Sequence, residues 1–245
     1  MILRTIAVLV FAFALLPLTA SGKEKRGFTD TFPLGDCQFS STGGNAYFIL
    51  TPGRQTHYNN AACVAAGGCD ELEELTITVL NEEKDIPLEI NGMLHNVRTR
   101  VVQEYETADG ELAEISRNYF VSCANNGDVY YFGEDVDIYE NGQVVSHDGA
   151  WLSGVDGAMP GIVMPGGAFL LGSRYYQEVA PDVALDRAEH TAMNVDVSVP
   201  AGDFTGCVEV TETTALEKHD VSTKIYCPGT GLVVDDDAEL TSVTP

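Results

Sequence analysis

Three successive turn signals between runs of strand-forming residues limit the fold of this sequence more than any other feature. They are the dipeptides Asp109-Gly110, Asn126-Gly127 and Asn141-Gly142. Such dipeptides adopt the positive φ angles of the tight turns that join antiparallel strands. The strand-like runs that they separate cover residues 97–107, 111–123, a segment from 128, and 143–147. The sequence therefore predicts an antiparallel meander in this part of the chain.

A second group of strand-like segments fills the C-terminal part of the chain. Turns with proline, glycine or charged residues separate these segments, which cover residues 174–179, 184–199, 204–216, 221–227 and 231–235. In one of them Met193, Val195 and Val197 alternate with polar residues, which is the period of a strand with one buried face. Helical patterns are nearly absent. We therefore predict an all-β fold, a large curved antiparallel sheet or open barrel of about nine to eleven strands.

A glycine-rich segment, residues 148–172, lies between the two groups. It contains seven glycines and Trp151, the one tryptophan of the chain, and it shows no clear period. We predict a long loop, and long loops inside compact domains are often functional. We expect Trp151 to lie partly exposed at the rim of a ligand cavity, with Met164 and Phe169 behind it. The alternative is that these side chains only pack against the core.

The N-terminal residues carry the pattern of a secretory signal. Arg4 precedes an apolar run over residues 6–18, and small residues follow at 20–22. This pattern predicts a signal peptide over residues 1–22 and a single β-rich secreted domain over 23–245. No later run is long and apolar enough to cross a bilayer, so no transmembrane segment is expected in the mature chain. The expected location is secreted or periplasmic.

The chain is strongly acidic. Its 37 Asp and Glu residues against 13 Lys and Arg residues give a formal net charge of -24. Such a surface repels the phosphates of nucleic acids and the anionic lipids of membranes, so nucleic acid is excluded as a partner. The expected partner is an unidentified small molecule or protein.

Six cysteines are present, with no C-x-x-C pair among them. In an exported protein such cysteines form disulfides rather than metal sites. Two cysteines close a short loop, two lie on consecutive predicted strands, and two remain. If cysteines that lie near each other along the chain pair first, the expected disulfides are, in order of preference, Cys63–Cys69, Cys207–Cys227 and Cys37–Cys123.

Seven short motifs lie between residues 45 and 234. They cover residues 45–53, 98–104, 116–120, 128–137 with the string YFGEDVD, 160–165 with PGIVMP, 175–178 with YYQE, and 228–233. In combination they resemble a group of secreted bacterial proteins that are usually described only as hypothetical. The resemblance implies an exported bacterial protein and assigns no activity or binding residue. The chain departs from the pattern at Ala46, where proline is expected, and in the insertion from Cys63 to Cys69.

Acidic residues on one predicted strand indicate a candidate cation site. Glu134, Asp135 and Asp137 lie within four residues of one another. Because alternate residues of a strand share a face, Asp135 and Asp137 would project together. Backbone carbonyls of the Asn141-Gly142 turn could complete an oxygen ligand set for calcium. The alternative is a solvated acidic strand without a metal.

A softer metal is the second candidate. Met159 and Met164 follow His147 in the sequence, and thioether sulfur with imidazole nitrogen suits copper. Methionine also fills gaps in protein cores, and we favour that role over copper binding. The sequence therefore predicts no obligatory cofactor, with calcium as the first candidate metal and copper as the second.

Recognisable catalytic and nucleotide-binding motifs are missing, among them G-x-S-x-G, H-E-x-x-H and the P-loop. We therefore favour a non-catalytic exported protein that binds a small apolar ligand or a partner. One alternative is an acidic protein that binds divalent cations or belongs to the structure of the cell envelope. Another is an uncharacterised hydrolase, because a catalytic triad is defined by geometry rather than by sequence spacing.

Overall fold

The computed structural model describes residues 27–217 and 219–245, so the predicted signal peptide, residues 1–22, lies outside the described residues. Within the described chain, helical structure is limited to α1 (Ala61–Ala66) and the 3-10 turn η1 (Leu34–Asp36). No helix in this part of the chain has the length and hydropathy of a membrane span. All strands belong to one sheet with antiparallel neighbours, which confirms the predicted all-β class.

The strands are β1 (Phe39–Ser40), β2 (Gln55–Asn59), β3 (Glu73–Ile90), β4 (Met93–Ala108), β5 (Glu111–Cys123), β6 (Val129–Glu140), β7 (Gln143–Ser146), β8 (Trp151–Leu152), β9 (Met159–Met164), β10 (Arg174–Tyr176), β11 (Glu178–Val179), β12 (Asp186–Val199), β13 (Gly202–Thr214), β14 (Val221–Cys227), β15 (Gly231–Asp235) and β16 (Ala238–Thr244). The predicted count of nine to eleven strands is therefore wrong, because the sheet has sixteen strands within the described residues. The longest strand that was not predicted is β3. Four charged residues at 82–85 and Pro87 interrupt its alternation of apolar and polar residues.

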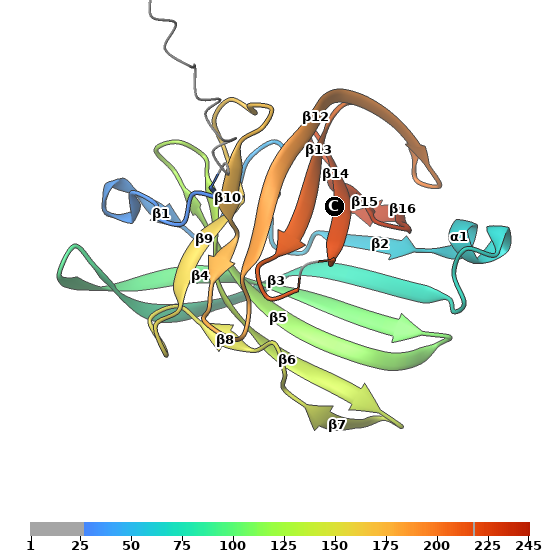
Figure 1. Cartoon of the computed structure of the whole chain (residues 1–245), viewed down its shortest axis with the longest axis horizontal. Helices are drawn as coiled ribbons and strands as arrows, with labels where there is room; N and C mark the ends of the chain where they lie inside the picture. Colours follow the sequence, from blue (N-terminus) through green and yellow to red (C-terminus); the bar gives the residue numbers. More distant parts are fainter. Residues whose placement is uncertain (1–26, 218) are drawn as a thin grey trace, which may run out of the picture.

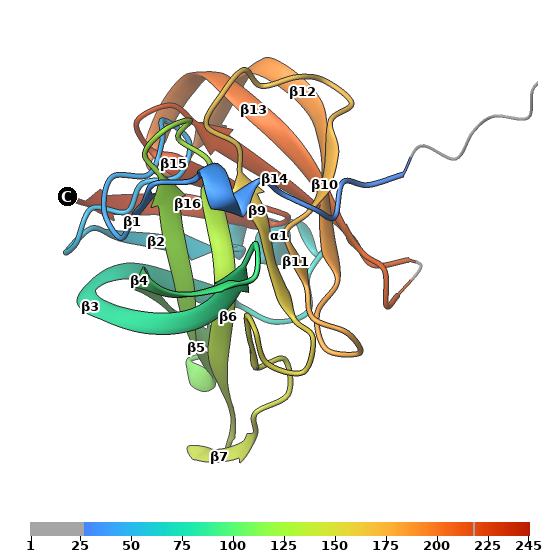
Figure 2. The same cartoon turned by 90° about the vertical axis from the view of Figure 1, so that its left-hand side faces the viewer.

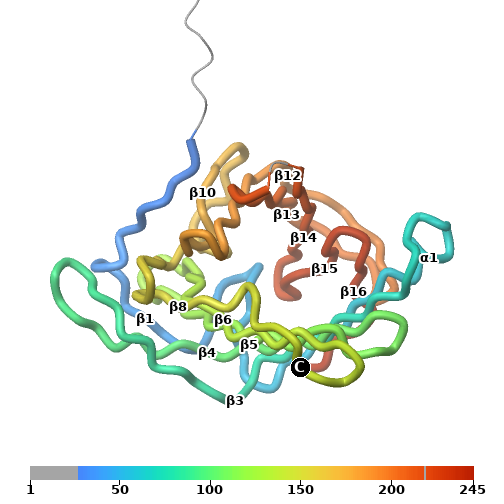
Figure 3. The backbone as a smooth tube through the Cα atoms, turned by 60° about the horizontal axis from the view of Figure 1, so that its bottom comes forward, coloured from blue at the N-terminus to red at the C-terminus, as the bar shows by residue number. Residues whose placement is uncertain are grey.

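The main path of the sheet runs β10-β12-β13-β14-β15-β16-β2-β3-β4-β5-β6-β9-β11. This path is open, yet its two end strands are consecutive in the chain, since only Gln177 separates β10 from β11. The sheet is strongly curled, with β12 to β15 opposite β3 to β6 (Figures 1 and 3). The curl gives the sheet a concave inner face.

The outer half of the β3–β4 hairpin folds back over β5 and β6 (Figure 2). Ile86 and Leu88 from β3 pack there against Tyr119 of β5 and Phe132 of β6, in a cluster of buried residues. These side chains of β5 and β6 lie on the outer face of the sheet, because their neighbours in the strands face inward. The strands β5 and β6 are thus covered on the outer side by the same hairpin that supplies part of the inner side.

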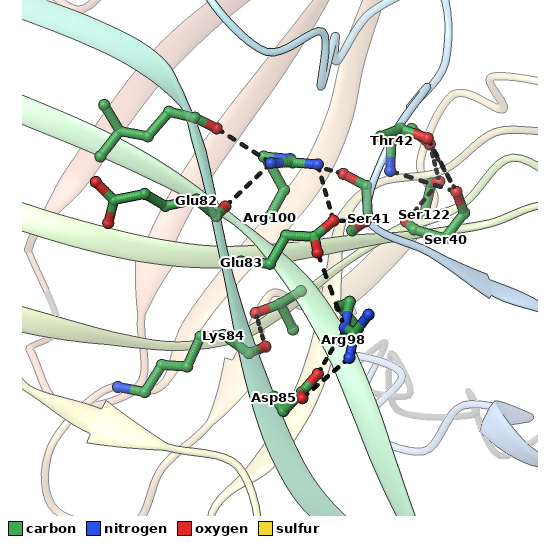
Figure 4. A network of polar contacts seen from close by, with 12 residues as sticks. Ser40, Ser41, Thr42, Glu82, Glu83, Lys84, Asp85, Arg98, Arg100 and Ser122 are labelled. Atoms are coloured by element: carbon green, nitrogen blue, oxygen red, sulfur yellow. Dashed lines mark hydrogen bonds and ion pairs between the residues drawn. The ribbon is translucent and has the colours of Figure 1, made fainter.

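A bulge in β3 accompanies this fold. Val79 pairs with Val102 while Glu83 pairs with Arg100, so two extra residues of β3 lie between the two pairs. Such a bulge leaves backbone carbonyls without strand partners and bends the strand. The side chain of Arg100, which is 3% exposed, supplies hydrogen-bond donors for such carbonyls. Its guanidinium donates to the backbone oxygens of Ser41, Leu80 and Glu82 and pairs with the Glu83 carboxylate (Figure 4).

The predicted tight turns are confirmed where strands meet. Asp109 and Asn141 have φ angles of 48° and 52°, and the glycine after each also has a positive φ. These turns connect β4 to β5 and β6 to β7. A third turn of this kind, Asn91-Gly92 between β3 and β4, was not among the predicted turns.

The prediction that residues 148–172 form a long loop is wrong. This segment contains β8 and β9, and both strands pair with β6. Glycine permits the close approach, because a Cβ on Gly133 of β6 would lie 2.5 Å from the backbone oxygen of Trp151. The glycines therefore allow close strand packing here, which sequence periodicity does not reveal.

Three disulfides are present, and they join the same three pairs that locality favours. Cys37–Cys123 ties the N-terminal segment to β5, Cys63–Cys69 closes the loop around α1, and Cys207–Cys227 connects β13 with β14. The described chain has no free cysteine.

Candidate ligand cavity

The curled sheet encloses a cavity of about 320 Å³. Every strand of the main path except β10 and β16 contributes a side chain to its wall. Inward residues follow the strand alternation, and the registers place Val102 of β4, Asn118 of β5 and Glu134 of β6 in one row. Glu104 follows two residues after Val102 and so faces the same side.

One part of the wall is apolar. Phe48 packs edge-to-face on Phe120, and Phe120 stacks on Tyr131, with ring centroids 4.9 Å and 4.8 Å apart. The buried residues Val79 and Val102 pack beside these rings. A hydrocarbon group placed there would replace water against an aromatic and aliphatic surface, which is the usual character of small-molecule sites.

The other part of the wall is charged. Six carboxylates face only two basic side chains, Arg54 and Lys224. The carboxylates belong to Glu104, Glu134, Glu178, Asp186, Glu212 and Asp235.

Lys224 is held between two of these carboxylates. Its Nζ lies 3.3 Å from Glu212 and 3.3 Å from Asp235. Burial alone lowers the pKa of Lys224, but the two carboxylates outweigh burial and raise it well above its ordinary value. The lysine is therefore a fixed cation inside the cavity, and its charge is already matched.

Glu104 and Glu134 have no such counterion, because neither makes an ion pair with the described residues. Burial raises the pKa of Glu104 to about 8, with Lys224 opposing and Glu106, Asp235 and Glu134 adding to the shift. Burial also raises the pKa of Glu134 to about 7. Both groups therefore exchange protons near neutral pH.

Glu178 is the most enclosed carboxylate, at 2% exposure. One of its oxygens accepts a hydrogen bond of 2.6 Å from the backbone N–H of Asp186. Burial and the nearby Asp186 charge raise its pKa well above the ordinary value. Glu178 therefore serves mainly to connect β11 with the start of β12.

The three residues predicted to bind a ligand do not come together. Trp151 is 7% exposed rather than partly exposed, and it packs with Ala158 and Ala180 beside a second hollow of about 330 Å³. Met164 is fully buried in another cluster, and Phe169 stacks on His190 at 3.7 Å there. Trp151 and Phe169 approach the main cavity only through residues that line it, Trp151 by its edge-to-face contact with Tyr131 and Phe169 by its ring contact with Tyr47 at 6.3 Å.

The acidic residues of β6 diverge as well. Asp135 and Asp137 share the outer face, as alternation predicts, whereas Glu134 faces the cavity. Asp135 pairs with Lys84 at 3.1 Å, and Asp137 lies 2.9 Å from Nδ1 of His147. The predicted calcium ligands are thus engaged separately.

The predicted copper set is likewise spread out. Met159 is 40% exposed, Met164 is buried, and His147 is occupied by Asp137. Across residues 27–217 and 219–245, the one group of three potential metal ligands that converges is Cys63, Cys69 and Asp237. Its two cysteines form a disulfide, so their sulfurs are not thiolate ligands.

Sequence analysis did not single out the cavity residues. Their signal was charged residues at inward positions of apolar strands, such as Glu104 after Val102 and Lys224 two residues before Tyr226. Asp235 belonged to an acidic run, Asp235-Asp236-Asp237, that resembles a solvated end. In the structure Asp235 faces the cavity and Asp236, with a φ of 51°, forms the turn into β16.

No known family model and no curated protein matches the sequence. Two solved structures are distantly similar. One is a candidate exported protein with a YmcC-like fold from Bacteroides fragilis, 15% identical, with a TM-score of 0.34 over 83% of this chain and 100% of that chain. The other is a candidate lipoprotein from Parabacteroides distasonis, 12% identical, with a TM-score of 0.35 over 82% of this chain and 99% of that chain.

Proposed function

We propose that this protein is an exported binding protein that holds a small amphipathic molecule inside its curled sheet. The observation that carries the proposal is the cavity of about 320 Å³, in which an aromatic and aliphatic wall faces a charged one. Small-molecule sites typically have volumes of roughly 300 to 1,000 Å³, with a mainly apolar lining and a few polar groups that orient the ligand.

Export is supported by the three disulfides, since such bonds persist in oxidising compartments. The disulfide Cys207–Cys227 also joins two strands that carry cavity residues. A covalent link between β13 and β14 keeps Glu212 and Lys224 in place when the cavity is empty, which lowers the entropy lost on binding.

The test is titration of the purified chain with N-phenyl-1-naphthylamine, an uncharged probe whose fluorescence rises in apolar surroundings. We expect saturable binding to the native chain. Val163→Trp should abolish it, because Val163 lines the cavity and a tryptophan would fill the space.

Val145→Trp is the matched control, since Val145 is 52% exposed on β7. It should bind the probe as the native chain does. Far-UV circular dichroism and the melting temperature establish that both variants are folded. Unchanged binding by a folded Val163→Trp chain, or no binding by the native chain, would contradict the proposed cavity site.

A further inference from the structure

Both basic groups of the cavity already have partners. Lys224 lies between Glu212 and Asp235, and Nη2 of Arg54 donates a hydrogen bond of 2.6 Å to the backbone oxygen of Thr230. When its six carboxylates are ionised, the cavity therefore carries more negative than positive charge, and Glu104 and Glu134 have no basic partner among the described residues. An anionic ligand would add to this imbalance, whereas a cationic ligand would relieve it.

The two unmatched carboxylates flank Asn118 across three adjacent strands. Glu104 and Glu134 lie on strands two apart in the sheet and are offset by two residues along the strand direction. The strand spacing and the rise per residue therefore place their Cα atoms about 12 Å apart. No third carboxylate of the cavity converges with them into a metal-ligand group within the described chain. A single metal ion needs several oxygens at about 2.3 to 2.6 Å, so this wall fits a larger organic cation better.

A further observation concerns Trp151, whose buried indole N–H faces the carboxylate of Glu134. Trp151 is the cross-strand neighbour of Glu134, and its ring packs edge-to-face on Tyr131 at 5.2 Å. Tyr131 lines the cavity together with Glu134, and Trp151 packs behind its ring. The carbons attached to an ammonium group can therefore pack against an aromatic surface beside the carboxylate.

Lys224 provides an example of this binding within the same cavity, since its ammonium is held by two carboxylates. We infer that the ligand is an amphipathic organic cation whose ammonium group binds at Glu104 and Glu134 and whose hydrocarbon part packs against Phe120 and Val79. This inference rests on the proposed binding function and specifies its ligand class.

The charged surroundings of the two carboxylates determine how pH acts on binding. Glu104 faces Lys224 of β14, Asp235 of β15, and Glu106 and Glu134. Glu134 faces Glu114 of β5 and Asp186 of β12, together with the polar groups of Tyr131 and Trp151. Because burial, with the acidic neighbours adding to it, raises the pKa values of both carboxylates, an arriving ammonium favours their ionisation, and protons are released on binding.

The experiment compares three ligands with the same chain length, n-octylammonium, 1-octanol and octanoate, by isothermal titration calorimetry at pH 8. We expect octylammonium to bind at least about tenfold more tightly than octanol, since hydrogen bonds to charged groups are stronger than neutral ones. Octanoate should bind most weakly. At pH 6.5 the binding heat of octylammonium should depend on the ionisation enthalpy of the buffer, as proton release requires.

Charge-removing variants locate the ammonium group. Glu104→Gln and Glu134→Gln should each reduce the octylammonium affinity about tenfold and leave the octanol affinity unchanged. Glu89→Gln is the matched control, because Glu89 lies exposed on β3 and the change removes the same charge. It should leave both affinities unchanged.

The outcomes separate the inference from the proposed function. If octanol binds as tightly as octylammonium, or if the two glutamine variants behave like Glu89→Gln, the cavity binds ligands but the cation inference is wrong. If octanoate binds most tightly, the ligand is an anion and the inference is also wrong. If neither the naphthylamine probe nor any octyl compound binds, the proposed binding function itself fails. Calcium titration is a further arm, and saturable calcium binding lost in Glu134→Gln would replace the organic cation with a metal.

Discussion

Lys224 and Asp235 are cross-strand neighbours on β14 and β15, and their charged groups lie 3.3 Å apart inside the curled sheet. Glu212 approaches the same Nζ from β13 at 3.3 Å and also accepts a hydrogen bond of 2.7 Å from the side-chain amide of Gln177. The lysine thus adds ion pairs to the backbone pairing that joins β13, β14 and β15. These contacts extend to Gln177, the residue between the two ends of the open strand path.

Replacement of Lys224 by methionine should therefore destabilise the fold. The change keeps most of the side-chain volume but leaves Glu212 and Asp235 without their counterion. We expect the free energy of unfolding to fall by about 2 to 3 kcal/mol, somewhat below the range for fully buried pairs because all three groups keep some exposure. Urea denaturation followed by circular dichroism measures this loss.

Two further variants control this prediction. Lys84→Met removes the ion pair with Asp135 on the outer face, where the side chains are 34% and 64% exposed, and should cost less than about 1 kcal/mol. Adding Glu212→Gln and Asp235→Asn to Lys224→Met should recover part of the lost stability. If Lys224→Met proves no worse than Lys84→Met, the three-strand charge cluster does not stabilise the fold.

Replacement of Arg100 even by lysine should destabilise the fold. Its guanidinium reaches three backbone oxygens and one carboxylate at the β3 bulge, a geometry that a single ammonium group cannot reproduce. We expect Arg100→Lys to lower the free energy of unfolding by about 2 kcal/mol through unsatisfied buried carbonyls. The same substitution at Arg98, whose side chain is 62% exposed and pairs with Asp85, should have no measurable effect.

Hydrogen exchange gives a second measurement of the Arg100 variant. If the bulge holds the folded-back hairpin, amides of residues 86–97 should lose protection before those of β12 and β13. Equal loss of protection in both regions would instead indicate general destabilisation.

The disulfides should differ in how much each contributes to the free energy of unfolding. Cys37–Cys123 spans 86 residues and Cys63–Cys69 spans 6. Loop-closure entropy in the unfolded chain predicts a contribution of about 4.5 kcal/mol for the long loop and about 2.4 kcal/mol for the short one. Paired Cys→Ala variants, compared by urea denaturation, test the difference. Equal losses for the two pairs would contradict the chain-entropy explanation.

The sequence predicted the hairpins well where turn chemistry and strand alternation agree. Asp109-Gly110 and Asn141-Gly142 each require positive φ angles, and each lies between strands in the structure. The strand β3 could not be predicted in the same way. Its outer half packs against the outer face of β5 and β6 and against the N-terminal segment around Leu34. Its alternation of Ile86, Leu88 and Ile90 is short and follows a run of charged residues.

The candidate site was beyond the reach of sequence periodicity for a different reason. Alternation shows that Glu104 and Tyr105 point to opposite sides of β4, but it does not show which side becomes concave. The direction of curl depends on the bulge at Arg100 and on strand pairs between distant segments, such as β2 with β16. The charged residues that line the cavity therefore have the same sequence pattern as a solvated strand face.

The raised pKa values of two cavity carboxylates, Glu104 and Glu134, and of the neighbouring Glu106 predict how stability depends on pH. Burial raises the pKa of Glu104 to about 8 and the pKa values of Glu106 and Glu134 to about 7. In the unfolded chain these groups have ordinary values, so between about pH 4.5 and pH 8 the folded state binds more protons than the unfolded state. The stabilisation is thus fully present below the unfolded pKa and is lost as pH rises through the folded pKa values. We expect the free energy of unfolding to decrease from pH 5 to pH 8.5.

Glu104→Gln should flatten this decrease, because a neutral amide cannot lose a proton, whereas the exposed control Glu89→Gln should keep the native slope. A native chain that becomes more stable from pH 5 to pH 8.5 would contradict the raised pKa values and show that these carboxylates are ionised in the folded state.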